Sequence, residues 1–244
     1  MTTVKGPVTM TPLIERQSGL WEIRRRLARE SSETTRKGPA HIAQGPFITI
    51  SKALGADWAG VARRLADHLG WQLFDREILE EIARESHIRG AILSQLDERE
   101  VSWIEETLAR LAIPDRPAQH AFLDQMARVI LALGRRGRAI LVGRGANWLL
   151  EPGCGLRIRM VSPLPARIAR VAACEGLAPA EARERIRQDD AARARFIRQA
   201  YRQEIDDPAG YDMILNVGSL AAEAAAECVL AALRHKLGPA AAGH

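Results

Sequence analysis

Five short apolar runs, separated by stretches of helical pattern, constrain the fold of this chain more than any other feature. They are Phe47–Ser51, Gln72–Asp75, Ala139–Arg144, Leu156–Val161 and Met213–Val217. The runs are too continuous for strands with one exposed face, because such strands alternate apolar and polar residues. Buried strands separated by helices are typical of a parallel sheet that is covered on both faces. The sequence therefore predicts an α/β domain with three layers and a five-stranded parallel sheet.

The chain divides by composition into three parts. Residues 1–44 contain several prolines and a polar run, and we interpret them as a basic, partly disordered N-terminal arm. Residues 45–238 hold all five runs and form the predicted domain. Within it, residues 76–137 are predicted to be a helical insert that caps a cleft, and residues 239–244 to be a frayed tail.

The composition is basic, with a formal net charge of +5, and only four of the 35 basic residues are lysine. Arginine suits phosphate recognition because its planar fork binds two oxygens at once. A high-GC genome also explains a general excess of arginine and alanine, so each arginine must be argued by its position.

No window approaches eighteen apolar residues and the N-terminus lacks a continuous apolar segment, so we expect neither a membrane span nor a secretory signal. The three cysteines, Cys154, Cys174 and Cys228, are scattered and lack metal-ligand spacing. We interpret them as reduced thiols of a cytoplasmic protein, and we predict no metal-ligating residues.

The first apolar run leads into the loop "KALGADWAG" and then into an amphipathic helix. Strand, glycine-containing loop and helix is the order found in phosphate-binding loops. The spacing of Gly55 and Gly60 fits such a loop, but Val61 and Ala62 then stand where lysine and Ser/Thr belong. Asp57 would repel a phosphate, or it caps the helix and completes a plain turn. The loop alone leaves both interpretations open.

Other polar residues follow the predicted strands. Arg144 and Asp75 end two of the apolar runs, and ligands of open parallel sheets bind outside the carboxyl ends of the strands. Asp190, Arg193 and Arg195 lie on one helical segment. One interpretation is that these arginines face a phosphate-filled cleft. The alternative is that they belong to ion pairs: Arg144 to a pair in the core, and the others to pairs on an exposed helix.

Taken in order, several stretches resemble the bacterial cytidylate kinase-like family, a relative of the true cytidylate kinases among the P-loop nucleoside monophosphate kinases. They are "FITISKALG", "GVARRLADHLGWQLFDREILEEIA", "ILVGRGANWLL", "LRIRMVSPLPARIARVA" and "YDMILNVGSL". The resemblance covers about residues 46–237. It implies a P-loop NTPase-type fold, ATP and Mg²⁺ as cofactors, and CMP or a similar small phosphorylated acceptor.

The resemblance also implies roles for the loop after the first strand. It places the donor nucleotide on Gly55, Ala56, Trp58 and Gly60. The true kinases have their lysine at the position of Trp58 and their threonine at that of Gly60. A basic residue three positions before the loop is usual in the family, and here it is Lys52, which we expect to replace the missing lysine in part.

Three further segments match family positions. Arg144 matches the arginine of a G-R-D motif that grips the acceptor phosphate, although Gly145 stands in place of the aspartate. The segment around Asp190 resembles a lid that closes over ATP, with Arg193 and Arg195 as its arginines. Asp75 is expected to contact the sugar or base of the acceptor. The candidate catalytic residues are therefore Lys52, Arg144, Arg193 and Arg195. The candidate acceptor-binding residues are Asp75, Arg144 and Asp190.

Three functions remain open from the sequence. The first is an ATP-dependent nucleotide kinase whose activity is weak or altered, because the loop lacks lysine and Ser/Thr. The second is an inactive module that binds or senses nucleotides. The third is a basic protein that keeps the fold and binds a partner through its arm, although aromatic residues, at 5%, are too few to favour nucleic acid. The sequence does not predict the oligomeric state.

Overall fold

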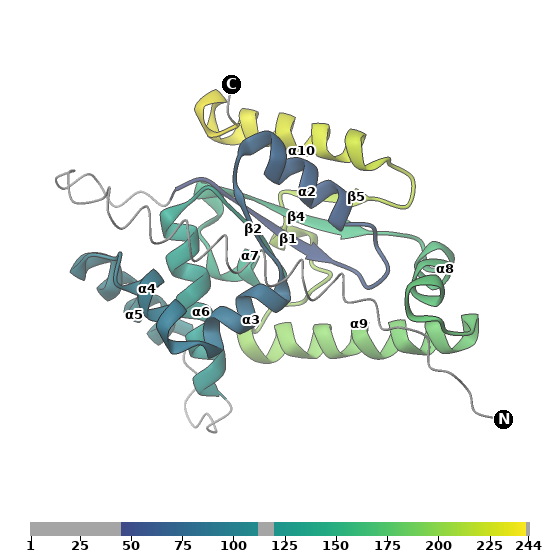
Figure 1. Cartoon of the computed structure of the whole chain (residues 1–244), viewed down its shortest axis with the longest axis horizontal. Coiled ribbons are helices and arrows are strands. Elements are labelled where there is room, and N and C mark those ends of the chain that lie inside the picture. Colours follow the sequence, from purple (N-terminus) through teal and green to yellow (C-terminus); the bar gives the residue numbers. More distant parts are fainter. Residues whose placement is uncertain (1–44, 112–119, 243–244) are drawn as a thin grey trace.

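The computed structural model describes residues 45–111 and 120–242, which fold into a central sheet between two layers of helices (Figure 1). The sheet contains five strands in the order β2-β3-β1-β4-β5, and every pair is parallel. The strands are β1 Phe47–Lys52, β2 Gln72–Phe74, β3 Ala139–Val142, β4 Gly155–Val161 and β5 Met213–Asn216. The predicted five-stranded parallel sheet is confirmed.

Strand β1 lies at the centre of the sheet and pairs with β3 on one side and β4 on the other. Phe47 opens the strand and is fully buried, and its ring fills the space beside Gly155, where a Cβ atom would lie 2.1 Å from the ring. Because β1 has neighbours on both sides and helices on both faces, its apolar run is continuous.

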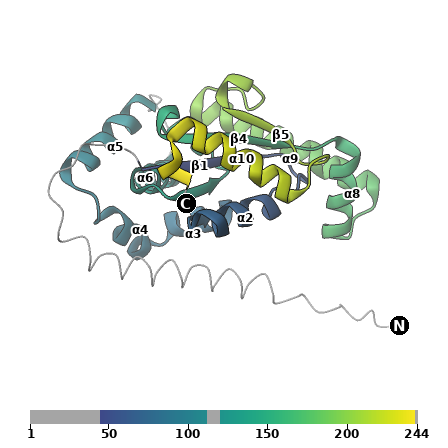
Figure 2. The same ribbon diagram turned by 90° about the horizontal axis from the view of Figure 1, so that it is seen from above.

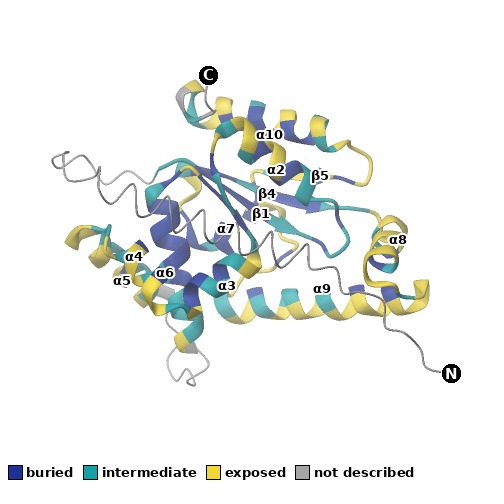
Figure 3. Cartoon of the chain, viewed as in Figure 1, coloured by how far each residue is buried: buried dark blue, intermediate teal, exposed yellow. Residues whose placement is uncertain are grey.

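Two hydrophobic clusters hold the layers together (Figures 1 and 3). On one face, α2 (Ala59–Leu69) and α10 (Ala222–Leu237) pack against alternate strand residues such as Ile48 and Ile50. On the other face, Phe47 and Phe74 pack against α3 (Arg76–Arg84), α6 (His120–Arg136) and α7 (Ala146–Leu149). The alternation along each strand divides its side chains between the two clusters.

The predicted helical insert forms α3, α4 (Ser86–Leu93), α5 (Glu98–Leu111) and α6. Helix α6 is a core element, since the side chains from Val129 to Leu133 are at most 2% exposed. Helices α4 and α5 lie outside it, away from the sheet (Figure 2). The insert therefore supplies part of the helical layer on one face of the sheet, and the first residue of α3 reaches the cleft described below.

Helix α8 (Leu164–Glu175) lies at the opposite end of the molecule from α5, and α9 (Pro179–Tyr201) runs from it back toward α3 and α6 (Figures 1 and 2). Helices α8 and α9 hold each other through a small cluster of Ile168, Val171, Ala182 and Ile186. Helix α9 has 23 residues but buries only Ala182, Ile186 and Ile197. A helix with so few buried residues depends on its polar contacts for its position.

The remaining described elements are short. They are the 3-10 turns η2 (Pro152–Cys154), η3 (Pro208–Gly210) and η4 (Pro239–Ala242), the last within the predicted frayed tail. The predicted N-terminal arm lies outside the described residues. None of the helices within residues 45–111 and 120–242 combines the length and apolar character that crossing a bilayer requires.

Candidate functional site

A cavity of about 190 Å³ lies at the carboxyl edge of the sheet, where β1 and β3 end. Four cationic side chains from different elements line it: Lys52 ends β1, Arg76 begins α3, Arg144 follows β3, and Arg193 comes from α9. Asp189 is the carboxylate that lines the cavity in the described part of the chain. The remaining lining residues are Ser51, Gly143, Gly145, Asn147, Ala192, Phe196, Ile197 and Ile205. An excess of positive charge in a partly enclosed cavity favours an anionic ligand.

Arg144 has an unusual backbone conformation for a residue with a side chain. Its φ is +54°, between Gly143 at +84° and Gly145 at +70°. The left-handed conformation costs an L-residue about 1–2 kcal/mol, so the surrounding structure must stabilise it. A hydrogen bond of 2.6 Å from the Tyr201 hydroxyl to the Arg144 carbonyl does so. The turn projects the Arg144 side chain into the cavity.

The Arg144 side chain is 17% exposed, and its guanidinium group lies between two neighbours. Its Nη2 atom pairs with Glu80, and its Cζ atom lies 5.6 Å from the ring centroid of Phe196. Burial and the nearby charge of Arg76 lower the pKa of Arg144 to about 10. The group still carries its charge at neutral pH, but a desolvated cation next to other cations binds an anion more strongly than an exposed one.

Lys52 places its ammonium group against the indole ring of Trp58. The Nζ atom lies 4.9 Å from the ring centroid, a cation–π contact. Burial lowers the pKa of Lys52 to about 8, and the charge of Arg193 adds to this effect. Trp58 therefore contacts a residue of the cavity, Lys52, although the Trp58 side chain does not line the cavity.

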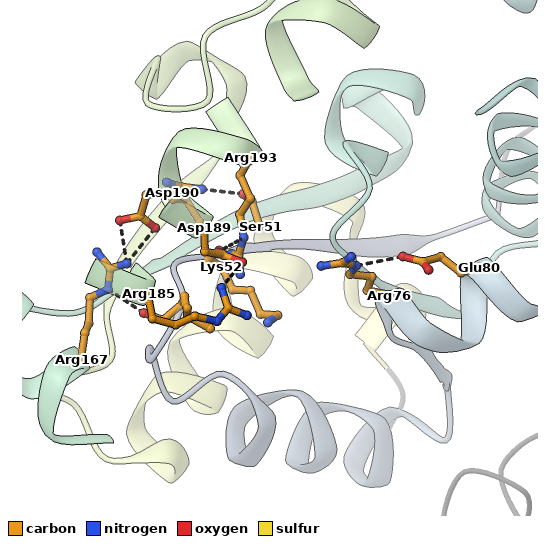
Figure 4. Close-up of polar contacts among 11 residues, drawn as sticks. Ser51, Lys52, Arg76, Glu80, Arg167, Arg185, Asp189, Asp190 and Arg193 are labelled. Atoms are coloured by element: carbon orange, nitrogen blue, oxygen red, sulfur yellow. Dashed lines mark hydrogen bonds and ion pairs between the residues drawn. The ribbon is translucent and has the colours of Figure 1, made fainter. Parts of the chain in front are cut away.

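Helix α9 is fastened to the cleft at Arg193 (Figure 4). Within α9, the Nε atom of Arg193 lies 2.6 Å from Oδ2 of Asp189. The contact that joins α9 to β1 is the hydrogen bond that a second guanidinium nitrogen donates to the carbonyl of Lys52. Burial lowers the pKa of Arg193. The side chain therefore reaches the start of the loop, and its role as a lid arginine stays a prediction.

A second contact fastens α8 and α9 to the loop. Arg167 donates from Nη2 to both carboxylate oxygens of Asp190 at 2.7 Å and from Nε to the carbonyl of Leu54 at 2.6 Å (Figure 4). Asp190 thus pairs with an arginine of the protein and does not line the cavity. Arg195 is exposed on α9 and does not line the cavity either, so its predicted role stays a prediction.

The loop after β1 has the position of a phosphate-binding loop but not its polar side chains. Gly55 has φ +80°, and a Cβ atom there would lie 2.8 Å from the carbonyl oxygen of Arg167. Gly55 therefore allows the loop to pack directly against α8, while Ala56 beside it is buried. Neither Gly55, Ala56 nor Gly60 lines the described cavity. Of the residues predicted to bind the donor nucleotide, Lys52 at the end of β1 is the one that lines the cavity.

Asp57 does not cap the helix, as one interpretation of the sequence had it. The N-cap residue of α2 is Trp58, and no side chain caps that terminus within the described residues. The carboxylate of Asp57 turns away to Arg170, with Oδ2 at 2.9 Å from Nη2. This pair reduces the repulsion that Asp57 would exert on an anion, and the first turn of α2 contains no acidic residue.

Asp75 has a local structural contact. Its carboxylate accepts a hydrogen bond of 2.9 Å from the backbone N–H of Ile78 and so caps α3. The cap fixes the start of the helix, and this start places Arg76 in the cavity. Asp75 itself does not line the cavity, and its predicted contact with the acceptor stays a prediction.

The sequence interpretation missed several residues of the cavity. Arg76 follows the same strand end as Asp75, and Ser51 precedes Lys52, so the strand-end argument could have included both. Phe196 carried no signal of its own, because α9 is too polar for its inner face to be recognised. Glu80 contacts the site from α3, one turn after Arg76, in an Arg–Glu pattern typical of ordinary helix surfaces.

The described residues do not form a complete metal site by themselves. The described residues contain no group of three or more His, Cys, Asp or Glu side chains that could hold a metal ion. The two side-chain oxygen donors nearest the loop already face arginines: Ser51 Oγ accepts a 2.8 Å hydrogen bond from Arg159, and Asp189 pairs with Arg193. Mg²⁺ at nucleotide sites is usually held by one or two carboxylates together with substrate phosphates and waters, and Asp189 is the cavity carboxylate among the described residues that could take part.

Comparisons with known proteins relate this chain to one family. A sequence profile of the cytidylate kinase-like family matches residues 47–219. A protein from Pyrococcus horikoshii named cytidylate kinase is 24% identical over 190 residues, which are 77% of this chain and 88% of that protein. One of the same name from Ignicoccus hospitalis is 24% identical over 75% of this chain and 95% of its own. Both relatives are archaeal, so they do not bear on the bacterial origin implied by the resemblance.

A solved structure shares the fold. The crystal structure of an uncharacterized protein from Eubacterium ventriosum superposes with a TM-score of 0.62 at 18% identity, over 79% of this chain and 99% of that one. At this identity the likeness concerns the architecture alone, and it agrees with the three-layer arrangement around the five-stranded parallel sheet.

Proposed function

The chain belongs to the cytidylate kinase-like family, and from this premise we propose that it transfers a phosphoryl group from ATP to a nucleoside monophosphate of the CMP type. The observation that carries the proposal is the group of four cations at the carboxyl edge of the sheet. Phosphoryl transfer needs mainly positioning and the neutralisation of spreading negative charge, and such a group supplies both.

The acceptor site in this proposal is formed by Arg144 and Arg76. Both guanidinium groups line the cavity and come from elements that meet at the carboxyl edge of the sheet. Arginine binds phosphate oxygens in pairs, and Arg144 is preset by its strained turn. Phe196 and Ile197 give the cavity an apolar wall suited to a flat base.

The donor site is formed by Lys52 and the N-terminus of α2. Lys52 lies where β1 enters the loop and stands in for the lysine that Trp58 replaces. The helix N-terminus adds a favourable interaction with an anion of about 1 kcal/mol. Arg193 reaches the same point from α9, where it neutralises charge on the group in transfer. A loop without the usual lysine and hydroxyl binds ATP weakly, so we expect slow turnover.

The second candidate is a module that binds nucleotides without turning them over. The observation in its favour is that side chains of the protein itself occupy the loop. Trp58 stands at the lysine position, and Arg193 donates a hydrogen bond to the carbonyl of Lys52. The third function considered above depends on the N-terminal arm, which lies outside the described residues.

The test is a coupled assay of ADP release across CMP, dCMP and UMP, on the wild type, Lys52→Ala and Arg193→Ala. Arg187→Ala is the matched control, because Arg187 lies on α9 but pairs with Glu184 at the surface. We expect turnover below the ordinary kinase range of about 1–100 per second, a further loss in the two site variants, and no change in the control. Turnover within that range would contradict the idea of an impaired loop.

Ligand-induced stabilisation separates the two candidates. Each nucleotide is added to the wild type and the unfolding temperature is measured. A ligand at a hundred times its dissociation constant adds about 2.7 kcal/mol to the free energy of unfolding. Stabilisation without ADP release would favour the binding module, and no stabilisation by any of the nucleotides would contradict both candidates.

A further inference from the structure

Glu80 connects three arginines at the wall of the cleft. Its Oε1 atom lies 2.8 Å from Nε of Arg76 and also pairs with Nη2 of Arg144 (Figure 4 shows the Arg76 contact). Its Oε2 atom lies 3.3 Å from Nη2 of Arg84. The Glu80 and Arg144 side chains are 14% and 17% exposed, so their contact is partly shielded from water, whereas the Arg76 and Arg84 side chains are 52% and 65% exposed.

The two cleft arginines need such a partner. Burial lowers the pKa of Arg144 first, and the neighbouring charge of Arg76 lowers it further, which shows that the two cations oppose each other. In a partly desolvated cavity, two side chains of like charge repel each other and move apart toward solvent unless an opposite charge pairs with both. Within residues 45–111 and 120–242, Glu80 is the carboxylate that contacts both guanidinium groups.

The charges around the cleft favour an anionic ligand. Lys52, Arg76, Arg144 and Arg193 line the cavity together with the carboxylate of Asp189. Two carboxylates of α3 act on it from beside the cavity: Glu80 pairs with Arg144, and the charge of Glu77 partly offsets the lowering of the pKa of Arg144 and Lys52. The four cations outnumber these carboxylates, so the cleft suits a phosphate monoester, which carries close to two negative charges at neutral pH.

We propose that Glu80 is a positioning residue that holds Arg76 and Arg144 together as a preformed site for the phosphate monoester of the acceptor. Glu80 holds the two arginines in the free protein, whether or not a ligand is present. The effect of Glu80 on acceptor binding rests on the proposed function. The opposite role, in which Glu80 competes with the ligand for the arginines, predicts tighter binding when its charge is removed.

The first experiment observes the arginines directly in the ligand-free protein. NMR signals of the arginine Nε–Hε and Nη–H groups are recorded for the wild type, Glu80→Gln, Glu80→Asp and Glu81→Gln, and are assigned with Arg76→Lys and Arg144→Lys. Glu81 lies on the same helix, so Glu81→Gln is the control for the loss of one charge from α3. Far-UV circular dichroism establishes that each variant is folded.

We expect the Nε–Hε proton of Arg76 and the Nη2 protons of Arg144, which face Glu80, to exchange with water about tenfold faster in Glu80→Gln, with little change in Glu81→Gln. Partial recovery in Glu80→Asp would support a carboxylate-specific role. Unchanged exchange in Glu80→Gln would overturn the proposal, whether or not the protein binds any nucleotide.

The second experiment measures CMP and ATP binding by calorimetry on the same variants. Loss of a charged hydrogen-bonding partner weakens binding by roughly tenfold, so CMP should bind about tenfold more weakly to Glu80→Gln, with ATP affinity and Glu81→Gln unchanged. Tighter CMP binding in Glu80→Gln would overturn the positioning role in favour of competition. If the wild type binds neither nucleotide, the proposed function fails, and the NMR experiment alone decides the role of Glu80.

Discussion

The hydroxyl of Tyr201 donates a hydrogen bond of 2.6 Å to the backbone carbonyl of Arg144, and this contact joins the last residue of α9 to the turn that presents the cleft arginine. Arg144 is one of the few residues other than glycine with positive φ in the described chain. The hydrogen bond therefore stabilises a backbone conformation that the residue does not favour by itself.

Tyr201→Phe tests this contact. The change removes the hydroxyl and keeps the ring, so the free energy of unfolding should fall by about 1 kcal/mol, the typical net value of a hydrogen bond. Because the turn loosens, CMP should bind a few-fold more weakly, while ATP binding stays the same. Chemical denaturation and calorimetry measure the two effects. Unchanged CMP affinity together with lower stability would show that the hydrogen bond supports the fold and not the site.

Gly145 stands where the related motif has an aspartate, and the structure gives a physical reason. A Cβ atom at Gly145 would lie 2.1 Å from Cε2 of the Tyr201 ring, whereas one at Gly143 would meet nothing within 4 Å. Both glycines have positive φ. We expect Gly143→Ala to lower the free energy of unfolding by about 1 kcal/mol through strain, and Gly145→Ala by about 3 kcal/mol through strain and overpacking. Equal losses in urea denaturation would contradict the packing of Tyr201 on this glycine.

Arg144→Ala tests the predicted acceptor contact, with Arg138→Ala as the control. Arg138 is also an arginine with positive φ, at 51°, but it is exposed and lies just before β3, at the other end of the strand. Arg144→Ala should weaken CMP binding about tenfold or more. The melting temperature should stay nearly unchanged, because Glu80 keeps its contacts with Arg76 and Arg84. A large loss of stability in Arg144→Ala alone would show that the guanidinium serves the fold.

The fold could be predicted from the sequence because strand patterns are local, and the same patterns located part of the site. Lys52 and Arg144 lie at strand ends, and the carboxyl ends of parallel strands meet at one edge. Contacts between distant segments could not be predicted in this way. The contact of Asp190 with Arg167 on the preceding helix is one example, and its predicted role in acceptor binding stays a prediction. Glu80 was missed, because its contact with the cleft exists only once α3 packs beside the end of β3.

The low pKa of Lys52 predicts how ligand binding depends on pH. Burial, followed by the charge of Arg193, lowers this pKa from 10.5 to about 8. Between these two values the folded protein binds fewer protons at Lys52 than the unfolded chain does, so the contribution of Lys52 to stability rises with pH in this window. The ammonium that attracts phosphate is lost over the same window. ATP affinity should therefore fall as pH rises through about 8.

The measurement is the ATP dissociation constant of the wild type, Lys52→Arg and Lys52→Ala from about pH 7 to about pH 9.5. Affinity for the wild type should fall about tenfold above pH 8, since each unit of pH beyond the pKa removes most of the remaining charge. Lys52→Arg should show no such fall, because arginine keeps its charge throughout this range. Lys52→Ala should bind weakly at every pH. The same fall in Lys52→Arg would assign the titration to another group and would separate Lys52 from donor binding.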